Sequence, residues 1–224
     1  MSGKVYDLAV IGGGINGAGI AADAAGRGLD VVLFEKGDLG GGTSSASSKL
    51  IHGGLRYLEY GALWLVRHAL AEREVLLDRA PHIIHPLRFV VPHGADMRSR
   101  LAIRAGLFLY DRLARRRRIP SSGSLDLTRD PMGRALKPGF RDGFSYYDCW
   151  VDDARLVVLA ALDAAGRGAT VLPRTPVARL ARAGDVWQID AGTRDALCAY
   201  TARAVVNAAG PWCAEVAALA APQQ

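Results

Sequence analysis

Three glycines near the start of the chain, Gly12, Gly14 and Gly17, have the spacing of a turn that binds a dinucleotide. In such a turn the first glycine allows the tight bend, the second lets a pyrophosphate approach the backbone, and the third lets a helix pack close to a strand. Glu35 follows at about 20 residues, the distance at which a carboxylate accepts hydrogen bonds from the ribose hydroxyls and repels a 2′-phosphate. The pattern therefore predicts a dinucleotide site that disfavours NADP and does not distinguish FAD from NAD.

The residues around these glycines predict the elements that must position them. Residues 6–11 form an apolar, β-branched run, residues 15–26 are rich in alanine and other small residues, and residues 30–34 form a second apolar run. We expect a buried strand, a closely packed helix that ends at Gly28, and a second parallel strand with a right-handed crossover. The helix N-terminus would offer backbone donors and a partial positive charge to phosphates. The same glycines also fit a tight turn in an unrelated doubly wound protein, so the pattern alone does not decide the function.

The rest of the chain predicts an α/β fold. Apolar residues recur at helical spacing in the segments 63–80, 101–113 and 152–165. Short apolar runs predict strands at 87–92, 169–172, 186–190 and 198–206, the last two in a β-meander. Residues 37–57 are dominated by Gly, Ser and Thr and predict a loop, and residues 119–145, with several prolines, predict a long irregular segment.

Composition narrows the class of protein. The chain has 224 residues, of which 50% are hydrophobic, enough for one sizeable core or one large and one small domain. Its three cysteines form no C-x-x-C pair and its histidines have no metal-ligand spacing, so we expect neither a metal site nor a disulfide framework. No apolar run approaches the ~18 residues of a membrane span, and no signal sequence is visible, which favours a cytosolic or peripheral protein.

Positive charge is partly local. The net charge of +6 favours phosphorylated substrates, anionic lipid or nucleic acid as partners without choosing among them. Arg115, Arg116, Arg117 and Arg118 follow the amphipathic segment 101–113. This run either contacts an anionic lipid surface or lies in solvent as a charged loop. No recognised module accompanies it, so we expect no nucleic-acid partner.

A longer motif follows the first βαβ unit. Residues 43–58 have the sequence TSSASSKLIHGGLRYL, which closely resembles the flavin-linked glycerol-3-phosphate dehydrogenases. The resemblance continues in the segments 71–74, 80–82, 147–156 and 207–212 and so spans nearly the whole chain. The order and spacing of these segments carry the resemblance, because each segment alone fits an ordinary loop or strand end.

The resemblance implies a fold and an activity. The fold would be a Rossmann-like FAD-binding domain with a parallel sheet, plus part of an α+β substrate or cap domain. The implied segments are 1–92 for the first part of the FAD-binding domain, 93–150 for the cap and 151–224 for the return to the FAD-binding domain. The implied reaction oxidises sn-glycerol 3-phosphate to dihydroxyacetone phosphate, with FAD taking the hydride and a membrane quinone, or oxygen in oxidase relatives, taking the electrons. Such an enzyme would be cytoplasmic and peripherally associated with the cytoplasmic face of the inner membrane, and a homo-oligomer stays open.

The resemblance also assigns cofactor residues. By similarity the FAD site comprises Gly12, Gly14, Ile15, Asn16, Gly17, Glu35, Lys36, Thr43, Ser44, Ser45, Lys49, Leu50, Ile51, His52, Gly53, Val177, Ala209 and Gly210. The serines, Thr43 and the segment 49–52 would line the pyrophosphate and the isoalloxazine ring. Val177 would meet the adenine through its backbone, and Ala209 and Gly210 would approach the nucleotide from a second turn.

Three residues of the same motif are candidates for catalysis: His52, Arg56 and Tyr57. The Arg56 guanidinium can bind a phosphate through two donors, with the Tyr57 hydroxyl as a third, although a surface ion pair also fits Arg56. His52 can take the substrate hydroxyl proton, because an imidazole titrates near working pH. It equally fits a residue that packs against the flavin.

Members of the resembled family are much longer than this chain. We therefore expect the chain to stop before the enzyme is complete, to bind FAD weakly and to have doubtful activity alone. Two other interpretations stay open. One is another flavoprotein of the amino-acid-oxidase-like class, and the other is a non-catalytic FAD-binding fragment that needs a partner chain.

Overall fold

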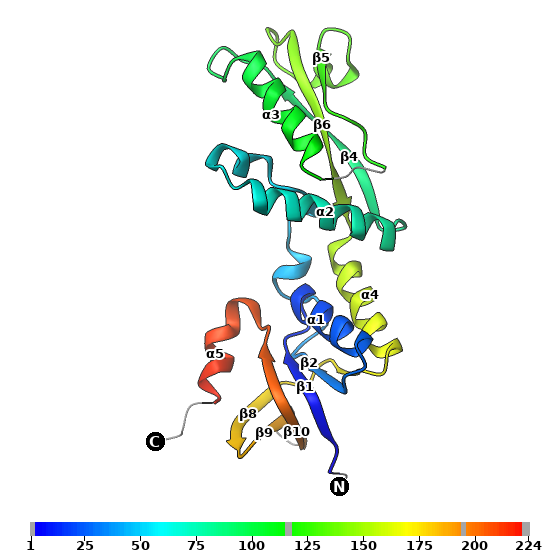
Figure 1. The fold of residues 1–224 in the computed structure, drawn as a ribbon, viewed down its shortest axis with the longest axis vertical. Helices are drawn as coiled ribbons and strands as arrows, with labels where there is room; N and C mark the ends of the chain where they lie inside the picture. The colour runs from blue at the N-terminus through cyan, green and yellow to red at the C-terminus, as the bar shows by residue number, and fades with distance from the viewer. Residues whose placement is uncertain (1–2, 115–117, 194–195, 221–224) are drawn as a thin grey trace. The chain divides into compact units, whose positions relative to one another are not determined.

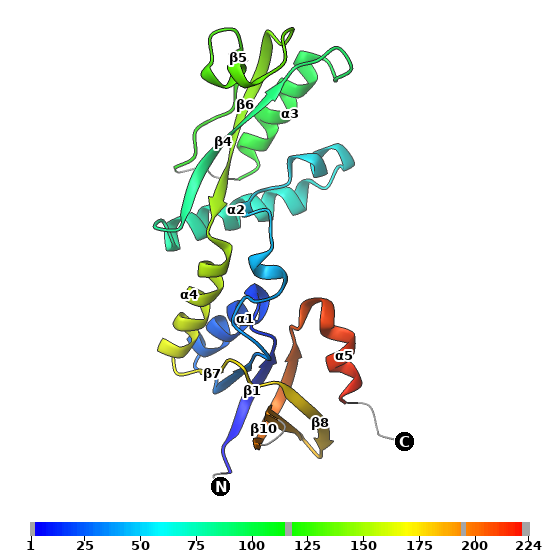
Figure 2. The same cartoon turned by 180° about the vertical axis from the view of Figure 1, so that it is seen from behind.

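The computed structural model describes residues 3–114, 118–193 and 196–220, which belong to two compact units. Unit 1 combines Met1–Ser48 with Asp153–Gln224, and unit 2 is Lys49–Asp152. Figure 1 labels the elements of both units, and Figure 2 gives the reverse view. The chain therefore leaves unit 1 after its first βαβ segment and returns to it at Asp153.

Unit 1 is built on a six-stranded sheet in the order β7-β2-β1-β10-β9-β8. Its strands are β1 (Val5–Ile11), β2 (Val31–Phe34), β7 (Thr170–Leu172), β8 (Val177–Ala183), β9 (Val186–Thr193) and β10 (Ala196–Asn207). β1 pairs in parallel with both β2 and β10, β2 pairs in parallel with β7, and β8, β9 and β10 pair antiparallel. β10 joins the parallel and the antiparallel parts of this sheet, because Thr201–Asn207 runs beside β1 while Ala196–Ala202 runs beside β9.

The alternation of side chains along the parallel strands separates two cores. Val10, Val31 and Leu33 pack with the alanines of helix α1 (Ile15–Gly26) and with Ala164 of helix α4 (Asp153–Gly166). Ile11 and Phe34 point to the opposite face, where the core includes residues of β8 and β9. Small residues on α1 and α4 let the two helices pack against each other beside the sheet (Figures 1 and 2). The short helix α5 (Cys213–Ala218) follows the 3₁₀ turn η4 (Gly210–Trp212).

Unit 2 is built on a four-stranded antiparallel sheet in the order β3-β6-β4, with β5 also paired to β6. Its strands are β3 (Leu50–Ile51), β4 (Ile84–Pro92), β5 (Gly123–Asp126) and β6 (Asp142–Val151). Helices α2 (Leu63–Arg79) and α3 (Arg100–Arg112) lie beside β4 and β6 (Figures 1 and 2). The 3₁₀ turns η1 (Thr43–Ser45) in unit 1 and η2 (Leu55–Tyr60) and η3 (Pro131–Ala135) in unit 2 complete the elements.

The expected α/β fold with a parallel, Rossmann-like sheet is confirmed, and so are the first strand, helix and second strand. The prediction of an irregular segment over 119–145 is wrong in part, because β5 and the start of β6 lie there. β6 is mostly buried on both faces and includes the polar residues Ser145 and Asp148, so it lacks the alternation of a half-buried strand. β8 was also not predicted, because Arg179 and Arg182 interrupt its apolar pattern at the edge of the sheet.

The unit boundaries differ from the expected domain segments. The expected boundary at 150 lies close to the return at Asp153, but the one at 92 falls inside unit 2. The reason is that β4 pairs with β6 along its length, from Ile84 opposite Val151 to Pro92 opposite Gly143. The assignment of these parts as a FAD-binding domain and a cap stays a prediction. Within the described ranges, no helix is both long and apolar enough to cross a membrane.

Candidate functional site

The glycine turn connects β1 to α1 with almost no free space. Gly12 has φ +113°, a conformation that favours glycine, and a Cβ there would lie 2.5 Å from the carbonyl oxygen of Ala208. A Cβ on Gly17 would overlap the carbonyl oxygen of Gly12. The first and third glycines thus have the geometric roles that their spacing predicts, a tight bend and a close helix.

The N-terminus of α1 meets the Ser/Thr segment of the longer motif. Gly14 is the N-cap residue of α1, and glycine has no side chain that could cap the helix. Instead the Ile15 backbone N–H donates to the Ser44 Oγ at 2.9 Å. A Cβ on Gly14 would lie 3.0 Å from the same oxygen. The structure therefore brings η1 (Thr43–Ser45) to the helix N-terminus, where backbone donors and the helix dipole favour an anion.

Glu35, directly after β2, is anchored to the same turn. Its carboxylate accepts one hydrogen bond from the Gly13 N–H at 2.6 Å and another from the Gly37 N–H at 2.7 Å. An ionised carboxylate has about four acceptor positions, so these two bonds leave capacity for ribose hydroxyls. The sequence predicted that Glu35 serves a nucleotide, but not that two backbone amides hold it in place.

A second turn lies against the first. The Ala208 N–H donates to the Ile11 carbonyl oxygen at 2.8 Å, and the Cβ position of Gly12 is 2.9 Å from the Ala209 Cα. The Asn207 side chain braces this turn, because its Oδ1 accepts from the Ala209 N–H at 3.2 Å and its Nδ2 donates to the Cys213 carbonyl oxygen at 2.8 Å. Asn207 was not among the predicted site residues, although the motif segment 207–212 contains it.

Trp212 is a second residue of that segment that the predicted site lacks. The Lys36 Nζ lies 4.1 Å from the centroid of a Trp212 ring, a cation–π contact. A Cβ on Gly42 would lie 3.0 Å from the same indole. Trp212 therefore packs between the residue after Glu35 and the loop that leads to Ser44.

Backbone hydrogen bonds connect the segment before β8 to Glu35 and to Gly37. The Thr175 N–H donates to the Glu35 carbonyl oxygen at 2.7 Å, and the Arg174 N–H donates to the Gly37 carbonyl oxygen at 2.9 Å. Val177 begins β8 two residues later. Unit 1 thus contains the following predicted residues: Gly12, Gly14, Ile15, Asn16, Gly17, Glu35, Lys36, Thr43, Ser44, Ser45, Val177, Ala209 and Gly210.

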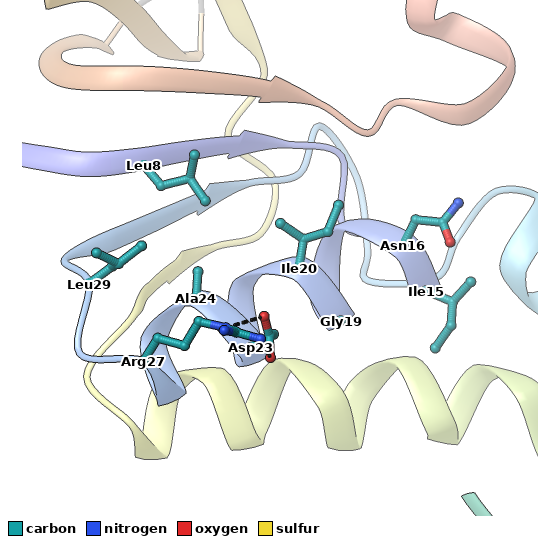
Figure 3. Close-up of a pocket in the computed structure, with 9 residues that line it drawn as sticks. All are labelled: Leu8, Ile15, Asn16, Gly19, Ile20, Asp23, Ala24, Arg27 and Leu29. Carbon is teal, nitrogen blue, oxygen red and sulfur yellow. Dashed lines mark hydrogen bonds and ion pairs between the residues drawn. The ribbon is translucent and has the colours of Figure 1, made fainter. Parts of the chain in front are cut away.

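Two depressions border these residues. One, of about 540 Å³, lies over α1 and is lined by apolar side chains such as Leu8, Ile20 and Leu29 beside the Asp23–Arg27 ion pair (Figure 3). The other, of about 320 Å³, is lined by Asn16 and Gly210 among others. The smaller depression is the more informative, because it lies between the two glycine turns.

The other predicted site residues, Lys49, Leu50, Ile51, His52, Gly53, Arg56 and Tyr57, lie in unit 2. The candidate catalytic residues His52, Arg56 and Tyr57 are exposed on the segment from β3 to η2. Gly54 has φ +71°, and a Cβ there would overlap the Tyr57 ring. This turn therefore requires glycine and supports the Tyr57 side chain.

Sequence reasoning missed a buried polar cluster beneath this segment. Arg73, Tyr110 and Asp148 are each at most 3% exposed and are hydrogen-bonded to one another through Asp148. Burial raises the pKa of Asp148, while the Tyr110 hydroxyl and the Arg73 guanidinium lower it. Arg73 and Asp148 lie in motif segments of the resembled family, but Tyr110 lies outside every such segment.

Comparison with known proteins identifies relatives over almost the whole chain. Residues 7–224 match the family described as FAD dependent oxidoreductase. The chain is 57% identical to D-erythritol 1-phosphate dehydrogenase of Brucella abortus, covering 95% of this chain and 43% of that protein. It is 58% identical to glycerol-3-phosphate dehydrogenase of Pseudomonas aeruginosa, covering 94% of this chain and 41% of that protein.

This chain is also similar in fold to a solved structure with the same described activity as one of these relatives. The glycerol-3-phosphate dehydrogenase of Bacillus halodurans, complexed with FAD, superposes with a TM-score of 0.70 at 30% identity and covers 96% of this chain and 36% of that one. The chain thus spans about two fifths of the length of the curated relatives it matches, at 43% and 41%. The predicted resemblance to flavin-linked glycerol-3-phosphate dehydrogenases is confirmed, and the chain belongs to the FAD dependent oxidoreductase family.

Proposed function

We propose that this chain forms the FAD-binding part of an FAD-dependent dehydrogenase that oxidises sn-glycerol 3-phosphate to dihydroxyacetone phosphate. One observation carries the proposal. The Gly12–Gly17 turn, the anchored Glu35 carboxylate and the Ala208–Gly210 turn meet at the carboxyl ends of β1, β2 and β10. Dinucleotides bind at such an edge in open parallel sheets. The 58% identity to the Pseudomonas aeruginosa enzyme supports the substrate.

The residues present fit FAD. Gly14 has no side chain to crowd the N-terminus of α1, and the Ser44 hydroxyl lies on that N-terminus. In this proposal that N-terminus would hold the pyrophosphate, and the Glu35 carboxylate would accept hydrogen bonds from the ribose hydroxyls. The Val177 backbone would meet the adenine, and Lys36, Ala209 and Gly210 would border the nucleotide.

The chemistry that FAD supplies when bound is acceptance of two electrons as hydride. The protein's residues bind and orient the substrate and move its proton. Arg56 binds the substrate phosphate through two N–H donors, and the Tyr57 hydroxyl adds a third bond. His52 takes the proton of the substrate hydroxyl at an imidazole nitrogen as the hydride leaves. Lys49, Leu50, Ile51 and Gly53, in the same segment of unit 2, belong to the proposed cofactor-binding residues.

A second substrate is favoured by a specific observation. The chain is 57% identical to a D-erythritol 1-phosphate dehydrogenase, nearly the same value as for the glycerol-3-phosphate dehydrogenase. Both substrates are phosphorylated polyols, so one set of phosphate-binding residues serves either. The two proposals differ in the space needed beyond the oxidised carbon.

The electron acceptor and the location belong to the same proposal. We propose a membrane quinone as acceptor, and a cytoplasmic enzyme that contacts the anionic inner-membrane surface peripherally. α3 supports this, because Leu101 is 83% exposed and Phe108 is 48% exposed beside the Arg112 guanidinium. Of the predicted basic run only Arg118 is described, since Arg115, Arg116 and Arg117 lie outside the described residues. A homo-oligomer stays a prediction.

The test uses anaerobic reduction of the bound flavin. The 224-residue chain is loaded with FAD, oxygen is removed, and each phosphorylated polyol is added in turn while the visible absorbance is recorded. Bleaching by sn-glycerol 3-phosphate alone supports the first proposal, and faster bleaching by D-erythritol 1-phosphate supports the second. Bleaching by neither, with FAD bound, would contradict the placement of the whole catalytic centre in these residues.

A further inference from the structure

A buried chain of hydrogen bonds in unit 2 ends on the backbone next to His52. The Arg73 Nη1 donates to the Asp148 Oδ1 at 2.6 Å, and the Tyr110 hydroxyl donates to the same oxygen at 2.8 Å. The Tyr110 oxygen in turn accepts from the Gly53 N–H at 2.8 Å. These hydrogen bonds therefore link α2, α3 and β6 to Gly53, the residue that follows His52.

The backbone at Gly53 is closely held. A Cβ on Gly53 would lie 2.6 Å from the Leu70 Cδ2 and 2.9 Å from the Tyr110 hydroxyl oxygen. Glycine is thus required for the backbone to approach Tyr110. The next residue, Gly54, turns the chain in the left-handed conformation at φ +71°. Gly53 is therefore constrained by packing on one side and by the turn on the other.

His52 lies close to the buried carboxylate of Asp148. β3 pairs with β6 at Leu50 opposite Trp150 and Ile51 opposite Cys149, and one further step in this register reaches Asp148 at His52. The positive charge of His52 lowers the pKa of Asp148, which agrees with this closeness. His52 itself is exposed, so its ring is open to solvent or a ligand while its backbone neighbour is buried.

We propose that Tyr110 and Asp148 are positioning residues for His52. The Tyr110 hydroxyl holds the Gly53 amide, Asp148 orients that hydroxyl, and Arg73 holds the Asp148 carboxylate. An imidazole that takes a proton must stand within hydrogen-bond reach of its substrate, and a supporting set of buried bonds provides this placement. The inference rests on the role of His52 in the proposed function.

The charges around His52 make the placement measurable. The titratable groups of the elements packed here include Tyr146, Asp148 and Cys149 on β6, Arg73 and Glu74 on α2, and Tyr110 on α3. The positive charge of the Arg73 guanidinium balances only one of the two negative charges of Glu74 and Asp148. Removal of the Asp148 carboxylate should therefore change the chemical environment of the His52 ring.

The experiment follows the 224-residue chain by nuclear magnetic resonance, without FAD or substrate. In Tyr110→Phe we expect hydrogen exchange of the Gly53 amide to accelerate about tenfold, the effect of losing one hydrogen bond. In Asp148→Asn we expect the chemical shifts of the His52 ring protons to change, because the carboxylate close to the ring is lost. If Asp148→Asn does not fold, Tyr110→Phe carries the test, because it removes one oxygen and keeps the ring packing.

Asp111→Asn is the matched control. Asp111 lies on α3 next to Tyr110, is 9% exposed and accepts from the Ser122 N–H and hydroxyl, both at 2.8 Å. Its loss should reduce stability without changing either readout at Gly53 or His52. Unchanged Gly53 exchange and unchanged His52 ring shifts in the two test variants would overturn the proposal, and so would equal changes in the control. Neither readout needs FAD, so failure here is distinct from failure of the proposed function.

Discussion

The Glu35 carboxylate accepts a hydrogen bond from the Gly13 backbone N–H at 2.6 Å, so the residue directly after β2 is bonded to the turn that follows β1. The bond aligns two features that a dinucleotide needs at once, an acceptor for its ribose and a helix N-terminus for its phosphates. Because the backbone of the turn supplies the donor, a substitution of Glu35 should affect both the conformation of the turn and the binding of the nucleotide.

Gly17→Ala should lower the free energy of unfolding by about 1–3 kcal/mol, because its Cβ would overlap the Gly12 carbonyl oxygen. Gly19→Ala on the same helix is the control, since a Cβ there meets no atom within 4 Å. That variant should gain about 0.5–1 kcal/mol, because alanine favours a helix over glycine. Urea unfolding of both variants measures the difference, and equal effects would contradict the close approach at Gly17.

Ser44→Ala should cost about 1 kcal/mol of stability, since the Ile15 N–H loses its acceptor at the start of α1. Ser48→Ala, an exposed serine of the same loop, should change stability by less than about 0.5 kcal/mol. Thermal unfolding of the two variants tests this. A Ser48 effect as large as that of Ser44 would mean that the loop, and not the helix cap, is responsible.

Much of unit 1 could be predicted because its signals are local. Apolar runs, the glycine turn and the alanine-rich helix lie within the first 34 residues, and each indicates its own conformation. The cluster of Arg73, Tyr110 and Asp148 could not be predicted, because its bonds join residues 75 and 38 positions apart in the sequence. The same reason hid β6, whose partners β3, β4 and β5 decide which of its residues are buried.

Cys149 should resist alkylation in the native chain. It is 0% exposed, and burial raises the pKa of its thiol to about 11, so the reactive thiolate is scarce at pH 8. Cys198 is exposed and should react first with iodoacetamide. Mass spectrometry of peptides after brief labelling checks the order. Equal labelling of Cys149 and Cys198 before unfolding would contradict the burial of β6.

The pH dependence of stability should carry a signature of Asp148. Burial raises its pKa, whereas the carboxyl of an unfolded chain titrates near ~3.9. The contribution of this group is therefore fully present below that pH and is lost as pH rises through the folded-state pKa. We expect the stability difference between the wild type and Asp148→Asn to fall over this window in urea unfolding. A difference that rises with pH would mean that Arg73 and Tyr110 outweigh burial.

The most direct test of the account is FAD binding by the 224-residue chain and by its Glu35→Gln variant, measured by calorimetric titration. Asp185→Asn, an exposed carboxylate in the β8–β9 turn, is the control. We expect the wild type and the control to bind FAD alike, and Glu35→Gln to bind it about 10- to 100-fold more weakly, because hydrogen bonds to a charged acceptor are lost. Equal FAD affinity in all three proteins, or no FAD binding by the wild type, would contradict it.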